Sequence, residues 1–460
     1  MRHAVLFCVL SGAAVVAPVL AVAGTDAAPR GPAALTGAAA GGRVVEYRGL
    51  RIPVPAGWAV HRLAEEPARC VRYDRHAVYL GRPGAQPDCP ARVVGRTEAV
   101  HVQPAGDVRT ARTVVHGDKL AALIVKPSVD HETRLTLPEA GVTITGVYGS
   151  DPGRLQRVLR GTRLAAGRTA APPEPAVRRM ATTIPPAPDG EPASGEASGQ
   201  AAPPDQTVPP DLAAPPDQST PPDQGTVPDE ALERPWVRGK GFDTCTAPSL
   251  VTMKAWRPSF KVTNIYIGGA ARGCAQPNLS ASWVKQVRKM GYRITPTYVG
   301  LQAPCGTRPQ RFTAKNAASQ GTKAAVDAAR KAGALGIPAG KPIYFDMEAY
   351  NFKKAACKAA VLRFVDNWVD RLKKEGYEPC LYSSAKSGIR DVARSTGTSK
   401  PVAVWFANWD GRAKVDGDPF VPDGLWSPHR RIKQYRGGHK EKHGGVTLNI
   451  DSNIADGRVY

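Results

Sequence analysis

Two carboxylates follow a short apolar run in the second half of the chain. The run is Ile343-Tyr344-Phe345, and Asp346 and Glu348 come directly after it. Residues i and i+2 of a strand point to the same face, and an unpaired buried carboxylate is costly. Two acids on one face at the end of a strand are suited to acid–base chemistry. The alternative is an edge strand with two charges on its solvent face, but continuous apolar runs are typical of strands buried on both faces.

Eight strand-like runs, separated by helical patterns, lie between residues 236 and 460. The runs are 241–243, 264–268, 293–299, 343–349, 379–383, 402–408, 431–435 and 446–451. Apolar residues at helical spacing predict helices over 280–290, 320–335 and 357–374. Strands that alternate with helices over about 225 residues predict an α/β fold, a (β/α)8 TIM-type barrel. Few helical residues separate the last three strands, so we expect the late helices to be reduced.

Polar and aromatic side chains stand at the ends of these runs, where a barrel of this type carries its active site. The candidate catalytic acids are Asp243, Asp346, Glu348 and Asp451. The candidate substrate-binding residues are Tyr298, Tyr344, Tyr382, Trp405, Asn408, Trp409, Gln434 and Tyr435. Paired carboxylates serve glycosidic-bond cleavage, and aromatic rings in a polar cleft stack on sugars. The set therefore predicts a glycan site, and we expect no cofactor.

Five short segments carry a family resemblance. They are Gly-Phe-Asp-Thr-Cys-Thr-Ala-Pro-Ser at 241–249, Tyr-Ile-Gly-Gly at 266–269, Pro-Thr-Tyr-Val-Gly at 296–300, Ile-Tyr-Phe-Asp-Met-Glu at 343–348 and Gln-Tyr-Arg-Gly-Gly at 434–438. In order and spacing they resemble the glycoside-hydrolase-like domain of exported actinobacterial proteins, a family similar to the glycoside hydrolase family 25 lysozymes. The resemblance covers 236–460 and none of the chain before it.

The resemblance implies a role for each acid. Glu348 would be the general acid, Asp346 would orient or stabilise the reacting centre, and Asp243 and Asp451 would support them. A general acid must hold its proton near the working pH, and a neighbouring carboxylate and burial both raise a carboxyl pKa. We therefore expect the pKa of Glu348 to lie above its ordinary value, and Asp346→Asn to lower it. The separation of the two carboxyls does not follow from the sequence, so retaining and inverting chemistry both stay open.

The first 235 residues divide by composition. Residues 1–23 read as a signal peptide, because Arg2 precedes an apolar stretch that ends in Ala21-Val22-Ala23; an uncleaved anchor is the alternative. Alternating apolar residues predict a small α+β or mostly-β domain over 43–166, whose role the sequence leaves open. Residues 167–235 are rich in proline and repeat Pro-Pro-Asp-Gln, which predicts a disordered linker. We expect 236–460 to fold alone.

Seven cysteines lie beyond the expected signal, and an exported chain meets oxidising conditions. Cys70 and Cys89 are the only pair before the linker, so we expect them to join. We expect Cys274–Cys305, because both lie in loops after neighbouring strands, and Cys245–Cys357 by elimination. Cys380 stands in an apolar run and would stay free. The cysteine spacings contain no Cys-x-x-Cys pattern, which argues against a structural metal.

Charge is concentrated in the second half of the chain. Residues 236–460 hold 37 Lys and Arg against 16 Asp and Glu, a net charge of +21 of the chain's +22. Such a surface attracts polyanions such as anionic cell-wall glycans; a merely solubilising charge is the alternative. The sequence carries no nucleic-acid recognition motif and, after the signal, no stretch that could span a membrane. We expect a secreted monomer that hydrolyses bacterial cell-wall polysaccharide; the alternative is a catalytically silent wall-binding module.

Overall fold

The computed structural model describes residues 42–105, 113–165 and 234–460, which all belong to one compact unit, 41–460. The expected signal peptide and nearly all of the expected linker lie outside the described residues. Among the described residues, no helix has both the length and the apolar character needed to cross a membrane.

Two sheets form the N-terminal region, residues 42–165. The first sheet has the order β1-β2-β8, and the second the order β3-β4-β5-β7-β6. Their strands are β1 (Arg43–Tyr47), β2 (Leu50–Val54), β3 (Ala59–Arg62), β4 (Ala77–Leu80), β5 (Ala99–Pro104), β6 (Glu132–Leu137), β7 (Val142–Val147) and β8 (Arg163–Leu164). Helix α1 (Gly153–Gly161) and the short 3-10 helices η2 (Gly117–Ala122) and η3 (Pro138–Ala140) complete it.

Sequence alternation explains how this region builds its core. In β2, Leu50, Ile52 and Val54 are buried and alternate with less buried residues, as the two-residue period of a strand requires. Helix α1 buries Leu155, Val158 and Leu159, which lie on one face at helical spacing. These side chains share a core with those of the five-stranded sheet, so the helix and both sheets bury one apolar interior.

Residues 236–460 form a closed barrel of eight strands in the order β9 to β16, with β16 closing onto β9. The strands are β9 (Trp236–Asp243), β10 (Val262–Gly268), β11 (Arg293–Tyr298), β12 (Pro342–Met347), β13 (Glu378–Ser384), β14 (Ala403–Ala407), β15 (Arg431–His443) and β16 (Val446–Arg458). Neighbouring strands from β9 to β15 run parallel. Strand β16 runs antiparallel to both of its neighbours, so the barrel is mixed.

The expectation of a (β/α)8 TIM barrel is therefore wrong. Helices separate only the first six strands: α3 (Leu250–Trp256), α4 (Ala281–Lys289), α5 (Ala317–Ala334), α6 (Ala355–Lys374) and the short pair η4 (Ala385–Ile389) and α7 (Arg390–Ala393). The fully described stretch 408–430 between β14 and β15 forms no helix, and its prolines and glycines oppose one. Strands β15 and β16 meet at Gly444-Gly445, both at positive φ, which makes a tight hairpin instead of a crossover.

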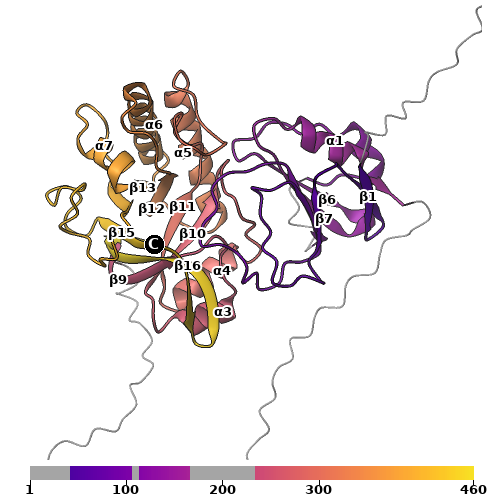
Figure 1. Cartoon of the computed structure of the whole chain (residues 1–460), viewed down its shortest axis with the longest axis horizontal. Helices are drawn as coiled ribbons and strands as arrows, with labels where there is room; N and C mark the ends of the chain where they lie inside the picture. The colour runs from indigo at the N-terminus through magenta and orange to yellow at the C-terminus, as the bar shows by residue number, and fades with distance from the viewer. Residues whose placement is uncertain (1–41, 106–112, 166–233) are drawn as a thin grey trace, which may run out of the picture. The chain divides into compact units, whose positions relative to one another are not determined.

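Helices α5 and α6 lie side by side next to β11, β12 and β13 (Figure 1). Alanines fill the buried face of α5, and at Gly321 the backbones meet, since a Cβ there would lie 2.4 Å from the carbonyl oxygen of Phe364. Strand β12 buries Ile343, Phe345 and Met347 in the core that these helices share. The alternate residues of the strand thus face the barrel interior, which fixes the direction of its acids.

Three disulfides are present in the described residues: Cys70–Cys89, Cys245–Cys274 and Cys305–Cys357. The first pair and the free, buried Cys380 confirm the expectation. The expected Cys274–Cys305 and Cys245–Cys357 are wrong. Neighbouring strands do bring the paired cysteines together, but the pairs join the segments after β9 and β10 and those after β11 and β12.

Candidate active site at the barrel mouth

Four acids meet inside the barrel at the carboxyl ends of its parallel strands. Asp243 ends β9 and lies opposite Asp451 of β16 in the strand register. Asp346 lies in β12, and Glu348 follows one residue after that strand ends. All four side chains are buried. The structure thus brings the four predicted acids into one buried cluster.

Gln434 of β15 ties the first two acids together. Its Nε2 donates to Asp243 at 3.0 and 3.2 Å and to Asp451 Oδ2 at 3.1 Å. Asn453 Nδ2 donates to Asp243 Oδ2 at 2.6 Å. Burial raises the pKa of Asp243 well above its ordinary value, and the neighbouring charge of Asp451 raises it further. Burial likewise raises the pKa of Asp451.

Gln302 holds the Asp346–Glu348 backbone from the next strand-end loop. Its Nε2 donates to the carbonyl oxygen of Asp346, and its Oε1 accepts from the amide of Glu348, both at 2.7 Å. These two bonds take the place of backbone hydrogen bonds between strands at the point where β12 ends. They fix the backbone between the two acids, and so Gln302 positions both side chains.

Two arginines neutralise Glu348. Arg92 of the N-terminal region forms an ion pair with Glu348 Oε1 at 2.8 Å, and Arg308 donates to Oε2 at 2.7 Å. Burial by itself would raise the pKa of Glu348, but the two guanidinium groups outweigh burial, and the pKa lies below its ordinary value. The expectation of a raised pKa is therefore wrong for this state. The sequence did not show which basic residues reach the cluster, and those residues decide the direction of the pKa shift of Glu348.

Asp346 shows the opposite behaviour. Burial raises its pKa well above the ordinary value, and the charge of Glu348 adds to the increase. Asp346 Oδ1 finds no hydrogen-bond partner among the described residues. The two pKa values thus shift in opposite directions: that of Asp346 rises and that of Glu348 falls. Such a split between paired carboxyls is what acid–base assignments rest on.

Besides Gln434, three of the predicted substrate-binding residues lie with the acids. The hydroxyl of Tyr382 donates to Gln434 Oε1 at 3.0 Å, and Trp409 Nε1 donates to the same oxygen at 2.9 Å. The side chain of Trp409 is 60% exposed, which leaves its ring available to a ligand at the rim. Trp405 lies deeper, where its Nε1 donates to Asn453 Oδ1 at 2.8 Å.

The other predicted binding residues have different surroundings. Tyr298 donates to Asp327 of α5, on the helix side of the strands. Tyr344 donates to the carbonyl oxygen of Arg458 inside the barrel, and Asn408 donates to Asp418. Tyr435 is partly buried, and its carbonyl oxygen accepts from the amide of Gly411. The structure does not place the first three of these side chains against the acids.

Sequence reasoning missed Arg92, Arg308 and Gln302. Arg92 stands 256 positions before Glu348 in the sequence, in a region with no family resemblance, so no local pattern links them. Arg308 and Gln302 lie in an irregular loop after β11 rather than at a strand end. A search for basic residues in the loops that follow barrel strands would have found Arg308 as a candidate, but not Arg92.

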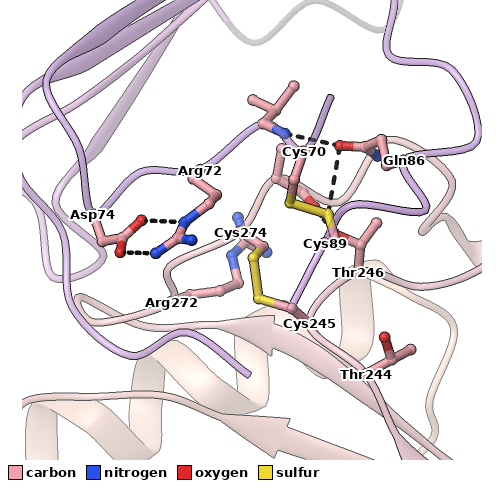
Figure 2. Close-up of a disulfide and its surroundings, with 12 residues drawn as sticks. Cys70, Arg72, Asp74, Gln86, Cys89, Thr244, Cys245, Thr246, Arg272 and Cys274 are labelled. Carbon is pink, nitrogen blue, oxygen red and sulfur yellow. Dashed lines mark hydrogen bonds and ion pairs between the residues drawn. A yellow bond between two sulfur atoms is a disulfide. The ribbon is translucent and has the colours of Figure 1, made fainter. Parts of the chain in front are cut away.

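Two disulfides lie next to each other beside the mouth. Figure 2 shows Cys70–Cys89 of the N-terminal region close to Cys245–Cys274 of the barrel. The sulfur atoms of Cys70, Cys89 and Cys274 lie within 4.8 Å of one another, but disulfide sulfurs are not thiolate ligands for a metal. Cys89 Sγ also contacts Thr246 Oγ1 at 3.6 Å. The four sulfurs thus form a buried apolar contact between the two parts of the chain.

The mouth of the closed barrel thus combines buried, paired carboxyls with an exposed tryptophan. Comparison with known families points to a glycoside hydrolase-like domain. Residues 254–455 match the Rv2525c-like, glycoside hydrolase-like domain. The second half of the chain therefore carries a glycoside hydrolase-like domain, as the sequence resemblance predicted.

Several solved structures are similar over about half of the chain. An uncharacterized protein of B. stearothermophilus is 20% identical and covers 48% of this chain and 99% of its own, with a TM-score of 0.33. The spore cortex lytic enzyme SleM of Clostridium perfringens is 16% identical and covers 44% of this chain and 62% of its own, with a TM-score of 0.31. The autolysin LytC of Streptococcus pneumoniae is 13% identical and covers 47% of this chain and 46% of its own, with a TM-score of 0.31. These scores are too low to carry an argument. No curated protein shows significant similarity to the chain.

Proposed function

We propose that the barrel mouth cleaves glycosidic bonds in bacterial cell-wall polysaccharide. The observation that carries this proposal is the buried pair Asp346 and Glu348 at the end of β12, where burial raises the pKa of Asp346 while Arg92 and Arg308 outweigh burial and lower that of Glu348. The pair lies in a glycoside hydrolase-like domain, and Trp409 offers an exposed ring beside it. The basic surface of the barrel favours an anionic glycan, and the three disulfides favour a location outside the cytoplasm.

Glu348 is the acid of the pair that contacts both arginines, and it directly follows the end of β12. In the proposed reaction a protonated carboxyl of the pair donates its proton to the glycosidic oxygen as the bond to the anomeric carbon breaks. Water supplies the hydroxyl group that this carbon receives, and its remaining proton returns to the pair. Asp243 of β9 and Asp451 of β16, both bonded to Gln434, support the cluster.

The experiment measures reducing sugar released from purified peptidoglycan by the wild type and by Glu348→Gln. We expect the variant to lose at least about 100-fold in rate, the lower range for loss of a general acid or base. Glu65→Gln, an exposed residue of the N-terminal region, is the matched control and should keep full activity. A wild type that binds the wall but releases no sugar would refute hydrolysis.

A silent wall-binding module is the second candidate. The ion pairs of Glu348 with Arg92 and Arg308 favour it, because they hold the expected general acid in its ionised form. Binding of wild type and Glu348→Gln to the wall with equal affinity, without release of sugar from either, is the result this candidate predicts.

A further inference from the structure

A loop of the N-terminal region crosses the barrel mouth. This mouth segment, residues 87–96, lies between β4 and β5 and carries Arg92. The guanidinium of Arg92 pairs with Glu348, stacks on the ring of Tyr382 at 4.6 Å from its centroid, and donates to the Tyr382 hydroxyl. The Arg92 side chain is only 14% exposed, and that of Glu348 only 8%. The segment thus places a cationic side chain directly on the proposed catalytic carboxylate.

Backbone bonds attach the mouth segment and a second stretch of the N-terminal region, residues 71–73, to one barrel loop. On one side, the Gly95 amide donates to the carbonyl of Ala271 at 2.7 Å, and the Gly273 amide donates to Val93 at 3.3 Å. On the other side, residues 71–73 bond to the same loop: the Tyr73 amide donates to Gly273 at 2.8 Å and the Ala275 amide to Val71 at 3.0 Å. The barrel loop 271–275 therefore lies between residues 71–73 and residues 93–95 of the N-terminal region.

Side chains strengthen this attachment. Gln310 of the barrel exchanges two 2.7 Å bonds with the backbone of Arg96. Glu132 pairs with both Arg96 and Arg272 at 3.2 Å. Val94 packs against Tyr266 on the barrel. The contact is largely polar, with small apolar patches, which resembles interfaces between domains that move relative to each other.

We propose that residues 87–96 are an intramolecular cover: Arg92 occupies the place from which a substrate must reach Glu348, and the mouth admits a ligand only when this segment leaves. The inference rests on the proposed function for its biological meaning, but the cover itself is tested without a substrate. A ligand that displaces the segment has to replace the guanidinium at Glu348 and the contact with Tyr382.

The backbone offers a direct way to lock the cover. A Cβ built at Gly438 of β15 would lie 3.7 Å from the Cβ of Ala91, close to the distance of about 3.8 Å that a disulfide needs. Gly438 does not have a positive φ, so cysteine fits its backbone. The double variant Ala91→Cys/Gly438→Cys should therefore form a disulfide that keeps Arg92 at the mouth. The single variants Ala91→Cys and Gly438→Cys are the matched controls.

The first measurement is the rate at which a carbodiimide couples an amine to Glu348, followed by mass spectrometry of the full chain. We expect the locked variant to react at least about 10-fold more slowly than either single variant. Arg92→Ala should react faster than the wild type, while Arg75→Ala, an exposed arginine of the same region, should not change. Equal rates for locked and single variants would overturn the cover.

The second measurement is hydrogen exchange at the amides of Tyr73, Gly95 and Gly273. If the cover opens while the barrel stays folded, these amides exchange faster than those of β12 and β13, and the lock slows them. Exchange no faster than in the core strands would mean that the contact opens only on global unfolding, which overturns the proposal. If Arg92→Ala binds more peptidoglycan and releases no sugar, the cover stands and the proposed hydrolysis falls.

Discussion

At the scale of single residues, the charge state of Glu348 depends on a residue from another part of the chain. Its two arginines outweigh burial and lower its pKa, whereas burial raises the pKa of Asp346, two positions earlier. The same carboxyl would behave differently without Arg92, because burial and the neighbouring acid both raise its pKa. The proposed cover therefore has a chemical effect as well as a steric one.

Arg92→Ala should raise the pKa of Glu348. Removal of one guanidinium leaves Arg308 alone to oppose burial, and so the proton binds Glu348 more tightly than in the wild type. NMR titration of carboxyl-labelled protein measures the change directly. Arg75→Ala is the control and should leave the titration of Glu348 where it is in the wild type. A Glu348 titration that is identical in Arg92→Ala and the wild type would contradict the ion pair.

Single residues also show how much of the candidate site could be predicted from the sequence. The apolar run ending in Asp346 and Glu348 indicated a buried strand with both acids on its inner face, and the two-residue period of a strand made that inference sound. Asp243 followed from its place at the end of β9, whereas Asp451 was inferred from a strand expected to end there and lies within β16. Arg92 could not be predicted, because its contact with Glu348 depends on how two separate parts of the chain meet.

At the scale of elements, local pattern predicted the strands better than their connections. Most of the strand runs were recognisable because they are short, apolar and bounded by turn residues. Strands β15 and β16, of 13 residues each, extend beyond the expected runs 431–435 and 446–451. The direction of the last strand was not recognisable, since a run of alternating residues reads the same in both directions. The hairpin at Gly444-Gly445 is the feature that reverses it, and two adjacent glycines were a signal for such a turn.

Helix α5 provides a prediction with its own control. Gly321→Ala should destabilise the fold by about 1–3 kcal/mol, because the new Cβ would meet the Phe364 carbonyl of α6 and force the helices apart. Gly333→Ala in the same helix should be neutral or stabilise by up to about 1 kcal/mol, since its nearest atom is the Tyr377 hydroxyl at 3.7 Å and alanine favours helix. Urea unfolding of both variants measures the difference. Equal effects would mean that the helices do not meet at Gly321.

At the scale of the whole molecule, the N-terminal region and the barrel share a contact that the sequence did not suggest. The proline-rich composition between them indicated a spacer, and a spacer by itself predicts nothing about contact. The same limit applied to the disulfide pairing. The sequence gives the positions of the cysteines, but which of them pair depends on which loops the folded strands bring together. The division of the chain into separate domains remains a prediction.

The fragment 236–460 tests that division. We expect it to fold under oxidising conditions, because all eight barrel strands and two of the disulfides lie within it. It should melt at a lower temperature than the full chain, since it exposes Tyr266 and the loop that Val94 and Tyr73 cover. Circular dichroism melts of fragment and full chain make the comparison, and a fragment that stays unfolded would show that the barrel needs the N-terminal region.

The order of the disulfides along the chain has a consequence for how the protein acquires them. Among the described residues, each bonded cysteine pairs with its neighbour in sequence, Cys70 with Cys89, Cys245 with Cys274 and Cys305 with Cys357, and Cys380 comes last. A chain exported with its N-terminus first would present these thiols to the oxidising side in this order. Each of the six would then meet its native partner before the next thiol emerged, and Cys380 would arrive when the other six are bonded.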